Sequence, residues 1–429
     1  MSQSWAKSTE ALVLGLVAIL GLFCRGVYAF FLGDILAIND AASYWNDAQS
    51  LATGAEYVPF FPPGLPLYLA LWIKCFGTTP LVALAAMLSL FAVLIWQIWT
   101  HFASKMRFSA QVGIGLFLFA SPELIHFSLS TQTQLPTALL LILGLRETLR
   151  PHMKLHHLCL LGLWMGLLVL VRPSNALVAG LLLLVAASKQ IRRASLLAAL
   201  GICVTIIGTW EIYAHKMTQR WIPINEATAM NLWFGNHEDT PLYATWWFGS
   251  HGIPEGTRAA SEFRQIRATP LAHQGKSYQK ALLQEIGKRP DLFLLRTINR
   301  IACFFAFDTF VGASIWQDAK AHTWATFFLI VDAILYVWLI WDTLRLRSFW
   351  LQKGYFWIIL AFALPYFFSF SHPSYHFPLL AVVCLINGQA KTANSKSDVR
   401  FWQFKTLLIV FLGIQVQWGI VNYWLLIGR

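Results

Sequence analysis

The chain has 429 residues, of which 57% are hydrophobic and only 12% are charged. Soluble domains carry about 25% charged residues, so this composition excludes an ordinary soluble enzyme and indicates a polytopic membrane protein. The formal net charge of +12 comes from basic residues whose positions along the chain match the expected membrane topology. We therefore expect the lipid bilayer as a partner and no nucleic acid.

Long apolar runs recur from Ala11 to the C-terminus, which predicts a single membrane domain over residues 1–429. We expect an all-α, polytopic bundle of about eleven transmembrane helices, or up to thirteen if two shorter apolar segments also cross the bilayer. The expected spans lie near residues 11–32, 79–100, 110–127, 135–149, 158–171, 174–188, 194–213, 322–342, 354–370, 374–389 and 401–427.

Basic residues are concentrated in alternate connections of this bundle. Those on the side of the N-terminus are Lys7, Lys105, Arg107, Arg146, Arg150, Lys154, Lys189, Arg192, Arg193, Arg345, Arg347, Lys353, Lys391, Lys396, Arg400 and Lys405. The opposite connections near 34–63, 121–134 and 371–373 contain none. The positive-inside rule therefore predicts a cytoplasmic N-terminus and places these opposite connections outside.

The first outer loop, over residues 33–78, is locally acidic. Between Asp34 and Pro66 it has no Lys or Arg, and its carboxylates are Asp34, Asp40, Asp47 and Glu56. If residues 40–51 form a helix, Asp40, Tyr44 and Asp47 lie near one face, a pattern that suits acid/base chemistry or a cation. The alternative is a solvated loop in which Asp40 caps the helix.

Apolar residues of the same helix are spaced to pack on a neighbour, namely Ala41, Ala48 and Leu51. The following segment, Gly64 to Phe76, comes after Pro62 and Pro63, which favour a helix start. At about 1.5 Å per residue it is too short to cross a hydrocarbon core of about 30 Å. We expect a helix that lies along the outer surface or re-enters the membrane partway.

A long outer loop over residues 214–321 is the other sizeable region outside the membrane. Its beginning is rich in Trp, Asn, Gly and Pro, which suits sugar stacking but also a membrane-interface belt. Toward its end, Asp291 to Phe307 predicts an interfacial amphipathic helix, with Arg296 and Arg300 on one face. We expect Leu292, Leu295 and Phe304 on the opposite face.

Three further features place cationic or metal-binding side chains in or near the spans. Arg25 in the first span either faces a partner or an anionic ligand, or extends its charge to the outer interface. Arg172 precedes Pro173, which predicts a helix break with a guanidinium suited to phosphate at the outer face. His372 and His376 could bind a metal with the outer Asp residues, but HxxxH across a proline is a weak metal signal.

The order of these features resembles the GT-C superfamily of polytopic glycosyltransferases, in particular its dolichyl-phosphate-mannose-protein mannosyltransferase-like and aminoarabinose transferase-like branch. The resemblance covers most of the chain through short motifs. These are Arg25, NDAASYWNDAQSLATG, FFPPGLPLYLALWIKCFG, GLLVLVRPSNALV, the Asn-Leu-Trp-x-Gly-Asn run at Asn231 to Asn236, ALLQEIGKRPDLFLLRTINRIACFF and HPSYHFPLL.

The resemblance implies an inverting glycosyltransferase that moves a sugar from a polyprenyl phosphate to a protein, lipid or polysaccharide acceptor at the non-cytoplasmic face, with the bacterial inner membrane as the expected location. Asp40 takes the role of general base. Substrate-binding positions are Arg25, Asp34, Tyr44, Lys74, Arg172, Asn231, Asn236, Tyr375 and His376, with Arg258 as a further cation for the phosphate. No cofactor is expected, and a divalent cation between Asp34 and Asp40 is the alternative.

The chain departs from the family pattern at two positions. Ser374 stands where many relatives have Arg, so His372, His376 or another Arg would have to contact the phosphate, and Gln134 stands where relatives often have Glu. Two other functions stay open: a transporter or flippase of lipid-linked substrates, which needs polar groups along the spans, and a non-catalytic relative that binds polyprenyl phosphate.

Overall fold

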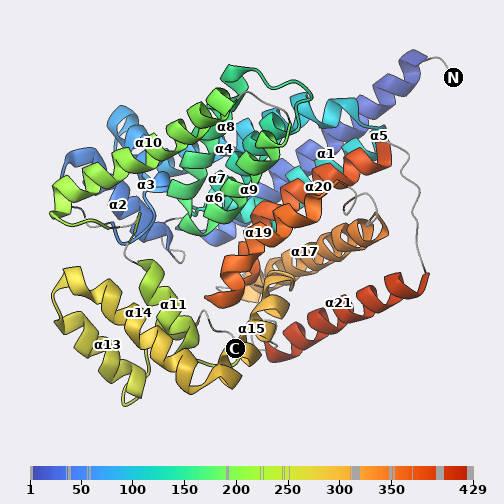
Figure 1. Cartoon of the computed structure of the whole chain (residues 1–429). Coiled ribbons are helices and arrows are strands. Elements are labelled where there is room, and N and C mark those ends of the chain that lie inside the picture. The colour runs from blue at the N-terminus through green and yellow to red at the C-terminus, as the bar shows by residue number, and fades with distance from the viewer. Residues whose placement is uncertain are drawn as a thin grey trace.

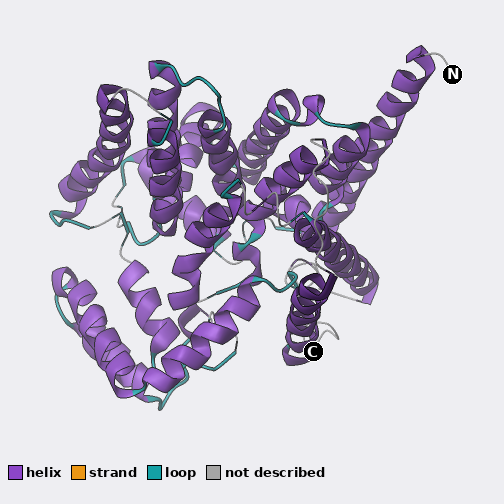
Figure 2. Ribbon diagram, turned by 45° about the vertical axis from the view of Figure 1, so that its right-hand side comes forward, coloured by secondary structure: helices purple, strands orange, loops and turns teal. Residues whose placement is uncertain are grey.

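The computed structural model describes residues 3–34, 36, 40–55, 57, 59–189, 193–222, 224–225, 227–243, 245, 247–250, 252–309, 311, 319–346, 350, 353–369, 371–392 and 401–422. In this part of the chain all regular structure is helical and no strand occurs (Figure 2). The predicted all-α class is therefore confirmed. Glu56 of the acidic stretch lies outside the described residues.

The helices follow one another along the chain as labelled in Figure 1. The first half contains α1 (Gln3–Leu32), α2 (Ala41–Thr53), α3 (Gly64–Phe76), α4 (Pro80–His101), η1 (Ala103–Lys105), α5 (Phe108–Ala120), α6 (Pro122–Leu129), α7 (Gln134–Thr148), α8 (Leu155–Val171), η2 (Pro173–Asn175), α9 (Ala176–Ala187) and α10 (Arg193–Thr218). The second half contains α11 (Ala227–Asn236), α12 (Trp247–Ser250), α13 (Arg258–Ala268), α14 (Leu271–Lys288), α15 (Pro290–Phe304), α17 (Ala319–Arg345), α19 (Tyr355–Phe368), η3 (Pro373–Tyr375), α20 (Phe377–Thr392) and α21 (Phe401–Val421).

Two helices, α7 and α20, form the centre of the bundle. Every residue of α7 is buried except Arg146, and α20 is buried from Phe377 to Gly388. A helix that is apolar around its whole circumference is stable only when neighbours surround it. Here α4, α8 and α9 pack on α7, while α5 and α17 pack on α20. The two ends of these helices therefore bring together loops from many parts of the chain.

Four helices are long and apolar enough to cross a membrane: Glu10–Leu32, Pro80–Lys105, Arg193–Thr218 and Thr323–Arg345. The number is five if the pair α5 and α6 counts as one broken span. Such helices suggest a membrane protein. The other apolar helices are shorter, at 10–17 residues: Gly64–Phe76, Leu155–Val171, Pro173–Ala187, Tyr355–Phe368, Phe377–Thr392 and Lys405–Val421. The larger number of spans stays a prediction.

The segment expected to span at 110–127 is bent rather than straight. Helices α5 and α6 meet at an angle of 47°. Pro122 lacks a backbone N–H and disfavours a helical conformation of the residue before it, and Ser121 accordingly has an extended backbone (φ −65°, ψ 122°). The bend leaves carbonyls at the end of α5 without helical partners.

Helices α11, α13 and α14 form a small group beside the bundle in both views (Figures 1 and 2). They share a core of their own, formed by Trp233, Phe234, Phe248, Ala259 and Tyr278. Helix α15 follows this group and packs on α19 of the bundle. The outer loop predicted at 214–321 thus contains a packed helical unit and not only loops.

The amphipathic helix expected at 291–307 is present as α15, but its two faces differ from the prediction. Arg296 and Arg300 are buried and donate to backbone carbonyls at the end of α11 and in the turn after it. Phe304 is buried on the same face, which corrects its expected position, whereas Leu294 and Ile298 are 62% and 63% exposed. The carbonyls at the end of α11 have no helical partners and accept hydrogen bonds from the two arginines, so this face of α15 is buried. The face that contains Leu294 and Ile298 is left exposed.

Candidate functional site

The candidate site is centred on Arg172, at the C-terminal end of α8. Pro173 follows it and ends the helix, so the Arg172 backbone is extended (φ −151°, ψ 113°). Its Nε donates to Oγ1 of Thr133 at 2.7 Å, and its Nη1 donates to the hydroxyl of Tyr366 at 3.1 Å. Ser174 also hydrogen bonds that hydroxyl, at 3.0 Å. The hydroxyl groups of Thr133 and Tyr366 therefore hold the guanidinium.

Two tyrosine rings lie together on one side of the same guanidinium. Its Cζ lies 4.7 Å from the ring centroid of Tyr375 and 5.9 Å from that of Tyr366. The two rings are 5.0 Å apart. A cation near aromatic rings is stabilised without losing its charge, so Arg172 keeps a full positive charge that an anionic ligand can use.

Asp40 and Tyr44 come to this cluster from the start of α2. Helix α2 begins after Asp40, which occupies the N-cap position, but the Asp40 side chain makes no cap hydrogen bond. Burial raises the pKa of Tyr44, and the exposed Asp40 carboxylate raises it further, while Arg172 and the Thr133 hydroxyl lower it. Asp40 also raises the pKa of Tyr375, after the larger effect of burial. The four predicted residues Asp40, Tyr44, Arg172 and Tyr375 are therefore neighbours.

Packing fixes α2 in this position. The residues predicted to contact a neighbour, Ala41, Ala48 and Leu51, are all buried, which confirms that face of the helix. Helix α3 has the expected bounds, and its first residue Gly64 lies so close to Val171 that a side chain at this position would clash. The start of α3 is thus held directly beside Arg172, and this approach requires glycine.

The two departures from the family pattern lie in contact. The amide nitrogen of Gln134 donates to the Ser374 hydroxyl at 3.4 Å, and Nδ1 of His372 is 2.7 Å from the same hydroxyl. A neutral Gln–Ser pair thus occupies the place where the family pattern has acidic and basic residues. The cationic group beside Tyr375 in this chain is Arg172.

Arg25 is not part of this cluster. It is buried in α1 and donates to the backbone carbonyls of Leu118 and Phe119, at 3.0 and 2.9 Å, and to Ser128. These carbonyls lie at the end of α5, where the bend toward α6 removes their helical partners. Arg25 therefore joins α1 to α5, and its predicted contact with a ligand is not supported by its position.

His376 likewise points away from Arg172. Its Nδ1 lies 2.7 Å from the Phe304 carbonyl, its Nε2 lies 3.1 Å from the Glu123 carboxylate, and its ring stacks on Tyr336. Glu123 is fully buried, so this pair belongs to the interior of the bundle. A metal shared by His376 and the outer Asp residues does not fit this arrangement.

Four other predicted residues lie outside the cluster or bind backbone. Asn236 donates to the Phe368 carbonyl at 2.8 Å and accepts from Arg300 at 3.0 Å. Asn231 is half-buried on α11, and Lys74 is exposed in the last turn of α3, far from Gly64. Asp34 accepts from the Leu36 backbone N–H at 2.9 Å, which closes a local turn.

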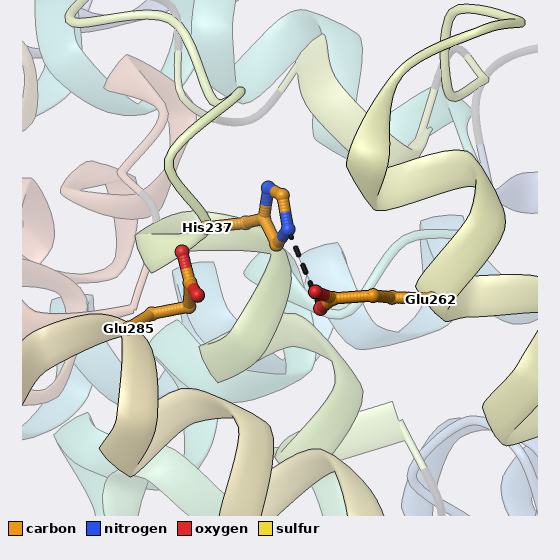
Figure 3. Close-up of side chains that lie close together, drawn as sticks. All are labelled: His237, Glu262 and Glu285. Carbon is orange, nitrogen blue, oxygen red and sulfur yellow. Dashed lines mark ion pairs between the residues drawn. The ribbon is translucent and has the colours of Figure 1, made fainter. Parts of the chain in front are cut away.

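A separate acidic group surrounds His237 in the unit formed by α11, α13 and α14. Figure 3 shows Glu262 and Glu285 beside the His237 ring, with Nε2 at 3.5 Å from Glu262. Of the residues described, only these three form a set of His, Cys, Asp or Glu with metal-like spacing. Asp34 and Asp40 do not belong to such a set.

Arg258 supplies the positive charge in this group. It pairs with Glu238 at 2.6 Å, with Glu262 at 2.9 Å and with Glu285. The Asp239 backbone N–H donates to His237 Nδ1, so the neutral ring keeps its proton on Nε2, the atom a metal would need. We therefore interpret the group as an ion-pair network, and Arg258 has no role at the Arg172 cluster.

Thr133 and Tyr366 are site residues that the sequence analysis did not identify. Thr133 lies just before α7 and Tyr366 lies in α19, both distant in sequence from Arg172, and both supply hydroxyl groups to it. A signal was present in each case: Thr133 belongs to a polar run before α7, and Tyr366 follows Pro365 in an apolar helix. Neither signal indicates which residue the side chain contacts.

Comparisons of the chain with protein-family models, curated proteins and solved structures find no match, so the family resemblance rests on the sequence motifs.

Proposed function

We propose that this chain is an inverting membrane glycosyltransferase that uses a polyprenyl-phosphate sugar at the non-cytoplasmic face. The observation that carries the proposal is the meeting of Asp40, Tyr44, Arg172 and Tyr375 at one end of the bundle. They come from α2, from the break after α8 and from η3. A carboxylate and a guanidinium near the same tyrosine rings suit a reaction that needs both a base and an anion site.

In the proposed reaction, a hydroxyl or amine of the acceptor attacks the anomeric carbon of the sugar. The new bond forms as the bond from this carbon to the phosphate oxygen breaks, and polyprenyl phosphate leaves with the bonding electrons. Asp40 accepts the proton of the acceptor, since its carboxylate is exposed and accessible. Arg172 stabilises the charge of the departing phosphate through guanidinium N–H groups.

The proposed membrane arrangement has about eleven spans, a cytoplasmic N-terminus and the Arg172 cluster outside. Support comes from the ends of α7 and α8. Thr133 and Arg172 lie at one end of these helices, whereas Arg146, Arg150 and Lys154 lie at the other. The basic end suits the cytoplasm, and the lipid phosphate would be bound at the opposite end.

A transfer assay tests the proposal. The purified chain in lipid nanodiscs would be supplied with polyprenyl-phosphate sugars and peptide, lipid and polysaccharide acceptors, and labelled product would be measured. We expect Asp40→Asn to lower transfer by about 100-fold or more. The matched control is Asp47→Asn, which removes a carboxylate two turns along the same helix and should retain transfer.

Full transfer by Asp40→Asn would refute the role of Asp40, and loss in Asp47→Asn alone would assign the base to that residue. Binding of the lipid donor without any product from the unmodified chain would support a non-catalytic relative. Movement of the donor between leaflets of a vesicle without sugar transfer would support a flippase.

A further inference from the structure

A basic pocket lies at the end of the bundle opposite the Arg172 cluster. It has a volume of about 280 Å³ and is open to the outside of the molecule. Its polar lining consists of His101 at the end of α4, Lys105, Arg146 and Arg150 near the end of α7, and Gln389 of α20. Helix α7 has 15 residues, so at about 1.5 Å per residue its two ends are roughly 22 Å apart. The pocket is therefore separate from the proposed transfer site.

A buried carboxylate orients the two arginines. Glu147 is fully buried, and its Oε1 accepts from Nε of Arg146 at 2.6 Å while its Oε2 accepts from Nε of Arg150 at 2.7 Å. Nη1 of Arg146 donates to Gln97 at 2.6 Å. These contacts fix the guanidinium planes before a ligand arrives, which lowers the entropic cost of binding.

The pocket keeps an excess of positive charge. Arg146, Arg150 and Lys105 carry three positive charges against the single negative charge of Glu147. Within the described part of the chain, the Nη groups of Arg150 and the amino group of Lys105 have no protein acceptor. Arg150 is one-third exposed and Lys105 is exposed. These donors are available to an external anion.

We propose that this pocket binds a phosphate group, carried by the headgroup of an anionic phospholipid or present as free phosphate. Two guanidinium Nη groups and one ammonium group match the oxygens of a phosphate. The pocket lies at the helix ends on the side expected to face the cytoplasm, where headgroups lie and where basic pockets between helices recruit anionic lipid. Phe102, Leu149 and Pro151 add an apolar wall on which the lipid glycerol and acyl chain can pack. The proposal does not depend on sugar transfer.

A titration of thermal stability tests this inference. The full chain in neutral detergent would be titrated with phosphatidylglycerol, phosphatidylcholine or inorganic phosphate while its unfolding midpoint is followed by tryptophan fluorescence, which gives an apparent affinity. We expect phosphatidylglycerol to bind at least about tenfold more tightly than phosphatidylcholine. Removing one basic residue should weaken binding about fivefold. Arg150→Gln should therefore lower the affinity for phosphatidylglycerol about 5-fold, and the double variant Arg150→Gln, Lys105→Gln about 25-fold.

Lys353→Gln is the control, since Lys353 is exposed before α19 and does not line the pocket. It should bind phosphatidylglycerol like the parent. Arg150→Gln also removes one partner of the buried Glu147 carboxylate and should lower the midpoint without ligand, so each affinity is taken from the ligand-dependent shift of the variant's own midpoint. If inorganic phosphate binds tightly and both substitutions weaken that binding, the site is supported and its ligand is free phosphate. Equal affinity for the two phospholipids together with no binding of inorganic phosphate, or an unchanged affinity in the double variant, would overturn the inference.

Discussion

Replacing Arg300 by Met is the strongest test of how the unit formed by α11, α13 and α14 is joined to the bundle. Arg300 is 1% exposed, and its guanidinium donates to the Gly235 carbonyl, to Asn236 Oδ1 at 3.0 Å and to the Phe367 carbonyl at 3.4 Å. Helices α11, α15 and α19 therefore meet at this one side chain. Methionine fills similar space but supplies no donor.

The expected cost follows from the acceptors that the substitution leaves behind. Each buried acceptor without a partner costs about 1–3 kcal/mol. The Gly235 carbonyl lies at the end of α11, where no helical N–H replaces the lost donor. Removal of the buried positive charge offsets part of this cost, because its desolvation penalty disappears as well. We expect a net destabilisation of about 2–4 kcal/mol.

The measurement is the unfolding midpoint of the purified chain in detergent, together with the rate of tryptic cleavage in the unit formed by α11, α13 and α14. Arg300→Met should lower the midpoint and speed cleavage after Arg264 and Arg267, which are on α13. The control is Arg289→Met, since Arg289 forms an exposed ion pair with Asp291 and should leave both quantities unchanged. A midpoint equal to or above that of the parent in Arg300→Met would refute the reasoning.

Three other predictions concern the site and the packing. Burial raises the pKa of Asp47 to about 6. The folded chain therefore binds the proton more tightly than the unfolded chain, and its stability falls as pH rises from about 4 to 6. After allowance for the partial exposure of Asp47, Asp47→Asn should raise the free energy of unfolding by about 1–2 kcal/mol at pH 7.5 and leave it unchanged near pH 4, measured by thermal unfolding. Arg172→Lys keeps the charge but loses the fork to the two hydroxyls, so kcat/KM of transfer should fall about 10- to 100-fold; an unchanged value would contradict the anion role. Gly162→Ala should destabilise by about 1–3 kcal/mol because the new methyl group meets the Ala199 carbonyl of α10, whereas Gly201→Ala faces open space and should be neutral or slightly stabilising by the same assay.

Local signals in the sequence predicted several elements well. Two prolines before Gly64 and a glycine after Phe76 determine the bounds of α3, and the structure has the same bounds. The spacing of small residues predicted the buried face of α2, and Ala41 and Ala48 are fully buried. These features depend on contacts within a few turns of chain, so a single sequence contains the information they require.

Partners that come from distant segments could not be predicted in this way. The spacing of Arg296 and Arg300 predicted a shared face correctly, but it could not show that this face covers the carbonyl end of α11. The contact between Gln134 and Ser374 joins two segments that are adjacent only in the folded bundle. Side-chain periodicity reports the direction of a residue from its own helix and gives no information on what lies there.

The acceptors around each arginine separate structural from ligand-binding roles in this chain. Arg25 and Arg300 are buried and directed at backbone carbonyls, so a phosphate could reach them only by breaking bonds that hold helix ends together. Arg172 is held by hydroxyl groups and tyrosine rings, which can rearrange at low cost, and Arg150 has Nη groups without a protein acceptor among the described residues. The side-chain charge is the same for all of these residues, so it does not distinguish them. The difference lies in whether the carbonyl groups of neighbouring helices already use the donors, and on that basis the two arginines suited to a phosphate lie at opposite ends of the bundle.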